Sequence, residues 1–285
     1  MSVTGYAHLA AIIGDPVRHS LSPVMHNAAF AAVDLDWLFV ALPVERGAAA
    51  RAMDAIRVLG IEGLSVTMPH KADAAAACDE VRGDAARLRS VNCVSRGPGG
   101  TLVGESTDGE GFIRSLREEG HDPSGRRALV LGAGGAARAV VLALAQAGAT
   151  VAVAARRAEA AADAAAMAAG IEAVEWPAVC DAARARELVV NATPIGMGGG
   201  DEAAALPFPP GHFGPGQVVA DLVYHPRRTP LLELAAAGGA ATVEGVGMLV
   251  HQGAIAFERW TATEAPVAVM RAAVLTALEG APGAG

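Results

Sequence analysis

A glycine-rich stretch, VLGAGGAARAV, constrains the fold of this chain more than any other part of its sequence. It follows an apolar strand expected at 128–131 and opens a helix expected at 134–147. Its pattern is G-x-G-x-x-A, formed by Gly132, Gly134 and Ala137. The first glycine allows a tight turn, the second lets the backbone approach a pyrophosphate, and the small third residue permits close packing of helix on strand. A glycine-rich turn alone is also a common structural feature, but the strand–turn–helix context favours a dinucleotide site at the helix N-terminus.

The strand that follows, expected at 151–154, indicates which dinucleotide binds. Enzymes that use NAD carry an acidic residue near the end of this strand, where it contacts the 2′-hydroxyl of the ribose. Here Arg156 and Arg157 follow the strand, and no acidic residue precedes Glu159. Guanidinium groups pair well with a phosphate. The alternative is that both arginines are solvated charges at a helix start, where the helix dipole disfavours cations. The sequence therefore predicts NADP as the cofactor.

Strand-like and helix-like segments alternate along the whole chain. Short apolar runs predict strands at 9–13, 37–44, 63–67, 128–131, 151–154, 187–191 and 218–222. Longer segments predict helices at 23–32, 47–58, 134–147, 158–169, 231–237, 248–260 and 267–278. This order predicts an α/β fold with a mainly parallel sheet covered by helices.

Composition excludes several classes of function. The net charge is −8, and no run rich in Lys or Arg is present, which argues against nucleic acid or an anionic membrane as a partner. Cys78, Cys93 and Cys180 are far apart and form no CxxC, so we expect inert thiols in a reducing compartment and no metal site. The N-terminus lacks the features of a signal peptide, and no stretch is long and apolar enough to span a bilayer. We therefore expect a soluble, cytoplasmic protein.

Polar clusters of the first half stand at or just beyond the ends of apolar segments. They are HSLS at 19–22, SVTMPHK at 65–71, SVN at 90–92 and STDG at 106–109. In an open α/β sheet, ligands bind outside the carboxyl ends of the strands. Taken singly, each residue reads as a turn or a cap, and Ser22 fits an N-cap for a helix beginning at Pro23. Together they suit a small polyhydroxylated acid.

At this point the sequence resembles a known family. The stretches GDPVRHSLSPVMHN, VTMPHK, VNC, STDG, GAGGAARA, NATPIGM and GVGMLVHQGAIAF are similar to the successive motifs of the shikimate dehydrogenase family, from about residue 10 to about residue 257. The resemblance implies an α/β substrate domain at 1–107 and 246–285, with C-terminal helices returning to it. A Rossmann-like NADP-binding domain would occupy 108–245, with the active site in the cleft between the domains.

The resemblance also implies a set of site residues. Ser20 and Ser22 would bind the substrate carboxylate, and the ring hydroxyls would contact Thr67, Lys71, Asn92, Asp108 and Gln252, with Tyr224 close by. The cofactor phosphates would lie on Gly132, Gly134, Gly135 and Ala136, and the 2′-phosphate on Arg156. The ribose and nicotinamide side would be lined by Asn191, Thr193, Val223, Gly245 and Met248.

The implied reaction is reversible hydride transfer between NADPH and the C3 carbonyl of 3-dehydroshikimate, a step of aromatic amino acid and chorismate biosynthesis. Hydride addition builds negative charge on the ketone oxygen, so a proton donor must stand beside it. Lys71 suits this role and stabilises the developing alkoxide, and Asp108 would orient the hydroxyl and the lysine. Outside the VTxPxK context, Lys71 would read as a solvated lysine after a proline turn.

Some positions depart from the family pattern and keep alternatives open. Ala155, Arg156 and Arg157 stand where the family often has Asn-Arg-Thr, and Ala160 stands where a second arginine is common. Arg157 would then replace that missing arginine. Ser106 stands where Asn is common before Thr-Asp-Gly. The alternatives are a quinate/shikimate or aminoshikimate dehydrogenase, a metabolite-sensing pseudoenzyme, and a plain structural Rossmann domain. Either a monomer or a homodimer fits the sequence.

Overall fold

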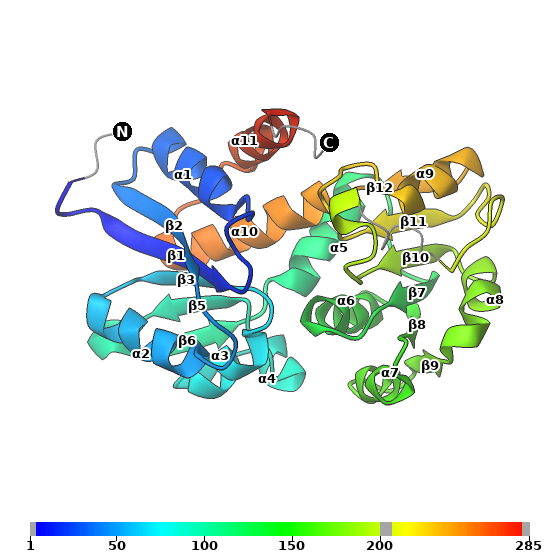
Figure 1. The fold of residues 1–285 in the computed structure, drawn as a ribbon, viewed down its shortest axis with the longest axis horizontal. Helices are drawn as coiled ribbons and strands as arrows, with labels where there is room; N and C mark the ends of the chain where they lie inside the picture. Colours follow the sequence, from blue (N-terminus) through cyan, green and yellow to red (C-terminus); the bar gives the residue numbers. More distant parts are fainter. Residues whose placement is uncertain (1–3, 200–206, 281–285) are drawn as a thin grey trace. The chain divides into compact units, whose positions relative to one another are not determined.

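The computed structural model describes residues 4–199 and 207–280, which divide into two compact units. The first unit comprises 4–107 and 250–280, and the second comprises 108–199 and 207–249. Both units combine helices with a sheet (Figure 1), so the α/β fold class predicted from the sequence is confirmed. None of the helices in the described ranges has the length and apolar character needed to cross a membrane.

The first unit is built on a mixed sheet with the strand order β2-β1-β3-β5-β6-β4. Its strands are β1 (His8–Gly14), β2 (Trp37–Pro43), β3 (Gly63–Val66), β4 (Glu80–Val81), β5 (Cys93–Arg96) and β6 (Leu102–Glu105). Its helices are α1 (Ser22–Ala32), α2 (Ala49–Leu59), α3 (Lys71–Ala77), α4 (Asp84–Leu88), α11 (Val267–Gly280) and the later part of α10 (Gly245–Thr261).

In this sheet β1, β2 and β3 are parallel, but β5 runs antiparallel to both of its neighbours, β3 and β6. The expectation of mainly parallel strands therefore misses β5. The short connection from β5 to β6, which contains only a 3₁₀ turn at Pro98–Gly100, accounts for the antiparallel pairing of these two strands. Parallel neighbours need a long crossover, whereas a short link joins antiparallel strands.

Alternation along the strands gives the first sheet two different apolar faces. On one face Ile13, Leu64 and Val66 pack with Met53 and Ile56 of α2. On the other face the rings of α1, β2 and α10 gather, among them His26, Phe30, Phe39, Phe257 and Trp260. Because successive side chains of a strand point to opposite faces, a few short strands separate an aliphatic layer from an aromatic one.

The second unit is built on a parallel sheet with the order β9-β8-β7-β10-β11-β12. Its strands are β7 (Arg127–Leu131), β8 (Thr150–Ala154), β9 (Glu172–Val174), β10 (Leu188–Asn191), β11 (Val218–Asp221) and β12 (Ala241–Val243). Its helices are α5 (Asp108–Glu118), α6 (Gly135–Gln146), α7 (Ala158–Ala165), α8 (Val179–Arg184), α9 (Pro230–Ala237) and the start of α10. Numbered from β7, this is the order 3-2-1-4-5-6 of dinucleotide-binding folds.

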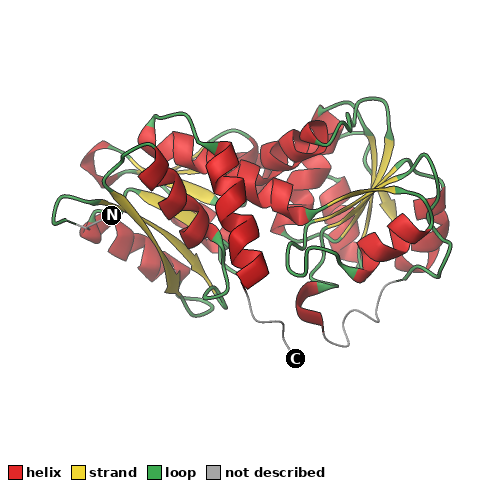
Figure 2. Ribbon diagram, turned by 90° about the horizontal axis from the view of Figure 1, so that it is seen from above, coloured by secondary structure: helices red, strands yellow, loops and turns green. Residues whose placement is uncertain are grey.

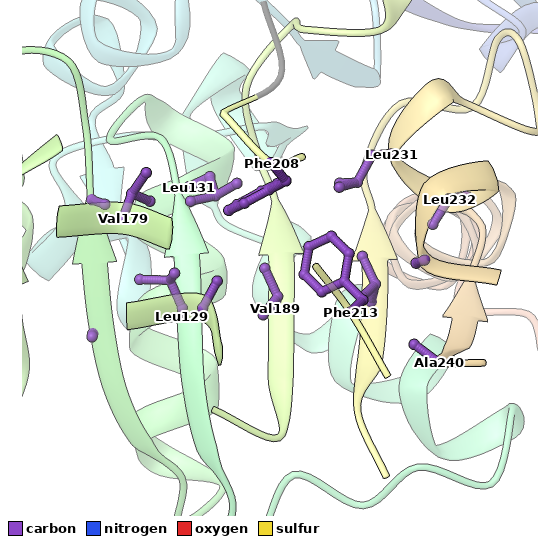
Figure 3. Close-up of a cluster of buried hydrophobic side chains, with 14 of the residues drawn as sticks. Leu129, Leu131, Val179, Val189, Phe208, Phe213, Leu231, Leu232 and Ala240 are labelled. Atoms are coloured by element: carbon purple, nitrogen blue, oxygen red, sulfur yellow. The ribbon is translucent and has the colours of Figure 1, made fainter. Parts of the chain in front are cut away.

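Helices lie on both sides of this sheet (Figure 2), so its strands are buried on both faces. One face carries a cluster in which Leu129, Leu131 and Val189 meet Phe208 and Phe213 (Figure 3). Each such large side chain contributes about 1.5–3 kcal/mol when it is fully buried. This core fixes the strand order, and the strand order fixes where the loops at the carboxyl ends meet.

Candidate functional site

The loops that follow β1 and β3 pack against each other at the carboxyl ends of the two strands. The Thr67 N–H donates to the Ile13 carbonyl at 3.0 Å, and the Asp15 N–H donates to the Met68 carbonyl at 2.9 Å. A Cβ at Gly14 would overlap the Thr67 methyl group and lie 3.1 Å from the Met68 oxygen. Gly14 therefore allows the close approach that holds Thr67 beside the end of β1.

Ser20 and Ser22 lie where the chain leaves β1 and enters α1. Ser22 is the first residue of α1, and Leu21, not Ser22, occupies the N-cap position, without any side-chain cap. The interpretation of Ser22 as a helix cap is therefore wrong. Instead, the Ser20 hydroxyl oxygen accepts from the Ser22 N–H at 3.2 Å. Ser22 is buried and Ser20 is partly exposed, so the two hydroxyls differ in access to solvent.

Asn92 organises a hydrogen-bonded network at the same strand ends. Its backbone carbonyl accepts from the Val66 N–H of β3 at 2.8 Å. Its side-chain Nδ2 donates to the Thr107 hydroxyl at 2.8 Å and to Gln252 Oε1 at 3.3 Å, and its Oδ1 accepts from the Thr107 N–H at 2.7 Å. Asn92 and Thr107 are 5% and 2% exposed. We call Asn92, Thr107 and Gln252 the amide network; it joins residues up to 160 positions apart.

Lys71 and Asp108 each occupy the first position of a helix. Lys71 begins α3, is partly exposed, and its backbone carbonyl accepts from the Val91 N–H at 3.0 Å, next to Asn92. Asp108 begins α5, directly after Thr107, and is 6% exposed. A helix N-terminus stabilises an anion and disfavours a cation. The position of Asp108 is thus favoured by its own helix, whereas that of Lys71 is not.

The chain contains no other lysine, although it contains 22 residues of Lys and Arg together. Every other cationic side chain is an arginine, which holds its proton throughout the range of pH in which proteins fold. The sole residue of this kind able to release a proton therefore stands at the start of α3. The presence of a single lysine is visible in the sequence and singles out Lys71 independently of the motifs around it.

The glycine-rich turn lies between β7 and α6. Gly132 has a φ of +110°, and a Cβ there would lie 2.8 Å from the Ala192 carbonyl, just after β10. Gly134 is the exposed N-cap of α6, and no atom lies within 4 Å of the position its Cβ would take. Ala137 is fully buried. The turn therefore needs glycine for packing at Gly132 and leaves open space at Gly134, at the point where the strand order reverses.

Arg156 and Arg157 follow β8 and are both exposed. Arg157 is the N-cap of α7 and makes no side-chain cap. Neither guanidinium pairs with an acidic side chain in the described parts of the chain. Two solvent-facing cations with no internal partner stand one strand away from the glycine-rich turn.

A second network ties together the ends of β10 and β11. Asp221 Oδ1 accepts from Asn191 Nδ2 at 2.9 Å and from the Val223 N–H at 3.0 Å, and Oδ2 accepts from the Thr229 hydroxyl at 2.7 Å. Asp221 is 1% exposed. Burial raises the pKa of this carboxyl to about 6, against the lowering effect of its hydrogen bonds. We call Asp221, Asn191 and Thr229 the carboxylate network.

The Asn191 side chain is saturated by its own protein. Its second donor position goes to the Ile195 carbonyl at 3.1 Å, and its Oδ1 accepts from the Thr193 N–H and hydroxyl at 3.1 and 2.7 Å. Thr193 in turn accepts from the Ile195 N–H at 3.2 Å. Asn191 therefore shapes the turn after β10. The groups of this turn that could contact a ligand are its backbone and Thr193.

The remaining predicted residues of the second unit lie beyond β11. A Cβ at Gly245 would lie 2.6 and 2.7 Å from the carbonyls of Leu222 and Val223, so the start of α10 packs directly on this loop. Met248 and Val223 are buried. Burial also raises the pKa of the partly exposed Tyr224, so its hydroxyl stays a donor at neutral pH.

The structure thus groups the predicted residues within each unit. Thr67, Lys71, Asn92 and Gln252 lie at the strand ends of the first unit, and Gly132, Asn191, Thr193, Val223 and Gly245 at those of the second.

Sequence reasoning did not assign Thr107, Asp221 or Thr229. In the sequence, Thr107 is marked only by its place in STDG, Asp221 by its place at a strand end, and Thr229 by the proline that follows it at the start of α9. In the described residues no cluster of His, Cys, Asp or Glu could hold a metal ion.

Comparisons with known proteins agree with this geometry. Residues 12–94 match the model of the shikimate dehydrogenase substrate binding domain, and 245–275 match that of the shikimate 5′-dehydrogenase C-terminal domain. The chain is 45% identical to a shikimate dehydrogenase (NADP(+)) of Moorella thermoacetica, over 97% of each chain. A Thermus thermophilus shikimate 5-dehydrogenase, solved with NADP(H) and shikimate, is 36% identical with a TM-score of 0.87, covering 95% of this chain and 100% of that one. A Corynebacterium glutamicum quinate dehydrogenase, solved with NAD, is 30% identical with a TM-score of 0.86, covering 95% and 99%.

Proposed function

This chain belongs to the shikimate dehydrogenase family, and we propose that it catalyses the reversible, NADPH-dependent reduction of 3-dehydroshikimate to shikimate. It is an NADP-dependent oxidoreductase acting on a CH–OH group, and its reaction belongs to aromatic amino acid biosynthesis. The observation that carries the proposal is the full-length similarity to NADP-dependent relatives, at 45% identity over 97% of both chains.

The residues of the second unit fit the cofactor. The open space at Gly134, together with the N–H groups of Gly135 and Ala136 at the start of α6, suits a pyrophosphate. At Gly132 the backbone of this turn packs closely against Ala192, which a larger residue would prevent. Arg156 and Arg157 would hold the 2′-phosphate, because they are exposed and have no internal acidic partner in the described chain. Thr193, Val223, Gly245 and Met248 would line the ribose and nicotinamide side, and Asn191 would fix the turn that presents Thr193.

The residues of the first unit fit a small hydroxylated acid. Ser20 and Ser22 would bind its carboxylate. Thr67, Lys71, Asn92 and Gln252 would bind its ring hydroxyls, joined by Asp108 and Tyr224 of the second unit. The support is the amide network, which fixes the orientation of Asn92 and Gln252 before any ligand arrives. We accordingly propose that 1–107 and 246–285 form the substrate domain and that 108–245 form the cofactor domain.

NADPH supplies a hydride to the carbonyl carbon when it is bound. The protein then has to manage the charge that develops on the carbonyl oxygen. We assign the proton transfer to the Lys71 ammonium, which donates to that oxygen and stabilises it electrostatically during the step. Asp108 would orient the substrate hydroxyl and the ammonium. In the oxidative direction the same amine takes the proton back.

A quinate/shikimate or aminoshikimate dehydrogenase is the second candidate. Two observations favour it: the likeness to the quinate dehydrogenase solved with NAD, and Ala160, which leaves no further arginine in the segment just after Arg156 and Arg157. Steady-state kinetics with shikimate, quinate and aminoshikimate, each with NADP and NAD, separate the candidates. We expect the highest kcat/KM for shikimate with NADP. Efficient turnover of quinate with NAD would overturn the first proposal.

We further propose that the enzyme works in the cytoplasm as a monomer or a homodimer. None of its cysteines forms a disulfide, which fits a reducing compartment. Sedimentation of the purified protein across a range of concentrations measures its oligomeric state, and a stable assembly larger than a dimer would contradict the proposal.

A further inference from the structure

A fully buried histidine separates Thr67 from Lys71 in the segment that links β3 to α3. His70 is the N-cap of α3 and is 0% exposed. Its ring Nε2 lies 2.7 Å from the carbonyl oxygen of Val44, just beyond β2. No role for this side chain follows from the proposed chemistry, because Lys71 alone moves the proton.

The hydrogen bond fixes the tautomer of the ring. A carbonyl oxygen only accepts, so Nε2 must carry the hydrogen that joins His70 to Val44. The other ring nitrogen, Nδ1, is buried without a hydrogen-bond partner among the described residues. A buried polar atom without a partner costs about 1–3 kcal/mol. What distinguishes His70 is its hydrogen bond to Val44, since His26 is equally buried and neither of its ring nitrogens is bonded among the described residues.

The bond from His70 is one link in a chain of contacts around the N-terminus of α3. The Val44 N–H donates to the Gly14 carbonyl at 3.1 Å, which ties the end of β2 to the end of β1. The His70 N–H donates to the Thr67 carbonyl at 3.0 Å. On the far side of His70, the Lys71 carbonyl accepts from Val91 at 3.0 Å, next to the amide network. His70 thus connects the end of β2 to the residue that begins α3.

We propose that His70 is a positioning residue for Lys71: its Nε2–H holds the start of α3 against the end of β2 and so fixes where the ammonium points. This inference rests on the proposed function, in which Lys71 donates the proton. A misplacement of a reacting group by about 1 Å can cost about 100-fold in rate. One hydrogen bond beside the lysine is therefore able to control kcat without touching either substrate.

Two amide substitutions test the bond itself. In His70→Gln the side-chain amide reaches about as far from the backbone as Nε2, whereas in His70→Asn it stops short, near the depth of Nδ1. Both introduce the same chemical group, so they differ in reach. We expect kcat with shikimate and NADP within about threefold of the wild type for Gln and a loss of about 10- to 100-fold for Asn. The KM for NADP should stay within about twofold in both.

His26→Leu is the control for removing a buried imidazole from the same unit. His26 is also 0% exposed, and neither of its ring nitrogens has a partner among the described residues. It stacks on Phe39 and has no link to α3 among the described hydrogen bonds. Thermal unfolding of each variant shows at which temperatures all of them are folded, and kcat is compared at such a temperature. We expect His26→Leu to lower Tm and to leave kcat within about twofold.

Because Lys71 is the only lysine, a lysine label at Cε gives a single side-chain NMR signal. At a fixed pH the chemical shift of that signal should be the same in the wild type and His70→Gln and should differ in His70→Asn. Equal kcat and an equal Lys71 chemical shift in the Gln and Asn variants would overturn this inference while leaving the proposed function intact. A wild-type protein that does not oxidise shikimate would overturn the proposed function and this inference with it.

Discussion

The amide network of the first unit lies where β3 and β6 end and β5 begins, the carboxylate network of the second lies where β10 and β11 end, and the two networks differ in charge and in saturation. The amide network consists of neutral groups, and Gln252 and the neighbouring Lys71 remain partly exposed. The carboxylate network holds an ionisable group that is 1% exposed and receives hydrogen bonds from Asn191, Thr229 and Val223. This difference supports the proposal that the first network presents groups to a ligand, whereas the second maintains the shape of a cofactor site.

The largest effect expected from this comparison is on Lys71, beside the amide network. Lys71→Ala should lower kcat by about 10²- to 10⁴-fold, because the general acid is lost, with a much smaller change in the KM for shikimate. Lys71→Arg should be nearly as slow, since arginine keeps the charge but does not release a proton. Steady-state kinetics at saturating NADP measures both, and near-normal kcat in either variant would remove Lys71 from the chemistry.

The carboxylate network should reveal itself first in stability. Asp221→Ala leaves donors of Asn191, Thr229 and Val223 without their acceptor, so we expect a loss of about 3 kcal/mol in the free energy of unfolding. Asp163→Ala on α7 is the control, because that carboxylate is exposed, and its effect should stay within about 0.5 kcal/mol. Urea unfolding compares them. Equal stability of the two variants would show that the network does not hold β10 and β11 together.

Arg156→Ala should raise the KM for NADP by about 10-fold or more and leave the KM for NAD nearly unchanged. Only NADP carries the 2′-phosphate, and a hydrogen bond between charged groups contributes about 1.5–3 kcal/mol. Arg184→Ala, an exposed arginine on α8 of the same unit, controls for the general loss of a surface cation. If both cofactors respond equally to Arg156→Ala, this side chain does not read the 2′-phosphate.

The last prediction concerns the pH dependence of stability. Burial raises the pKa of Asp221 to about 6 in the folded protein, above its ordinary value of 3.8. The contribution of this group to stability is therefore fully present below about pH 4 and is lost as the pH rises through about 6. Relative to Asp221→Asn, which does not titrate, the wild type should be more stable at pH 4 than at pH 7. A stability difference that is independent of pH between these values would contradict the shift.

The same contrast explains what the sequence could predict. The turn at Gly132 and Gly134 was predictable, because a local pattern of strand, glycines and helix specifies it. Lys71 and Asp108 stand out in the sequence only through the motifs around them, since a charged residue at the first position of a helix has no distinguishing pattern of its own. Asp221 was missed because its partner Asn191 lies 30 residues away, and their contact exists only once β10 and β11 pair.

Most long elements were predicted and most short ones were not, but the 11-residue helix α5 was missed. The long helix at 134–147 agrees with α6 to within one residue at each end. The strands β4, β5, β6, β9 and β12 were not predicted, whereas β3, β10 and β11, which have only four residues each, were, because all residues of these three are buried and they are read as apolar runs. Helix α7 ends at Ala165, although the alanine-rich run predicted it to 169. Alanine favours helix everywhere and therefore marks no boundary.

The most direct test of the proposed function is the ratio of kcat/KM values of the purified wild-type protein for shikimate with NADP and for quinate with NAD. We expect shikimate with NADP to be the preferred pair by at least about 10-fold, a difference of about 1.4 kcal/mol in transition-state stabilisation. An equal or reversed ratio, or no oxidation of shikimate at all, would contradict it.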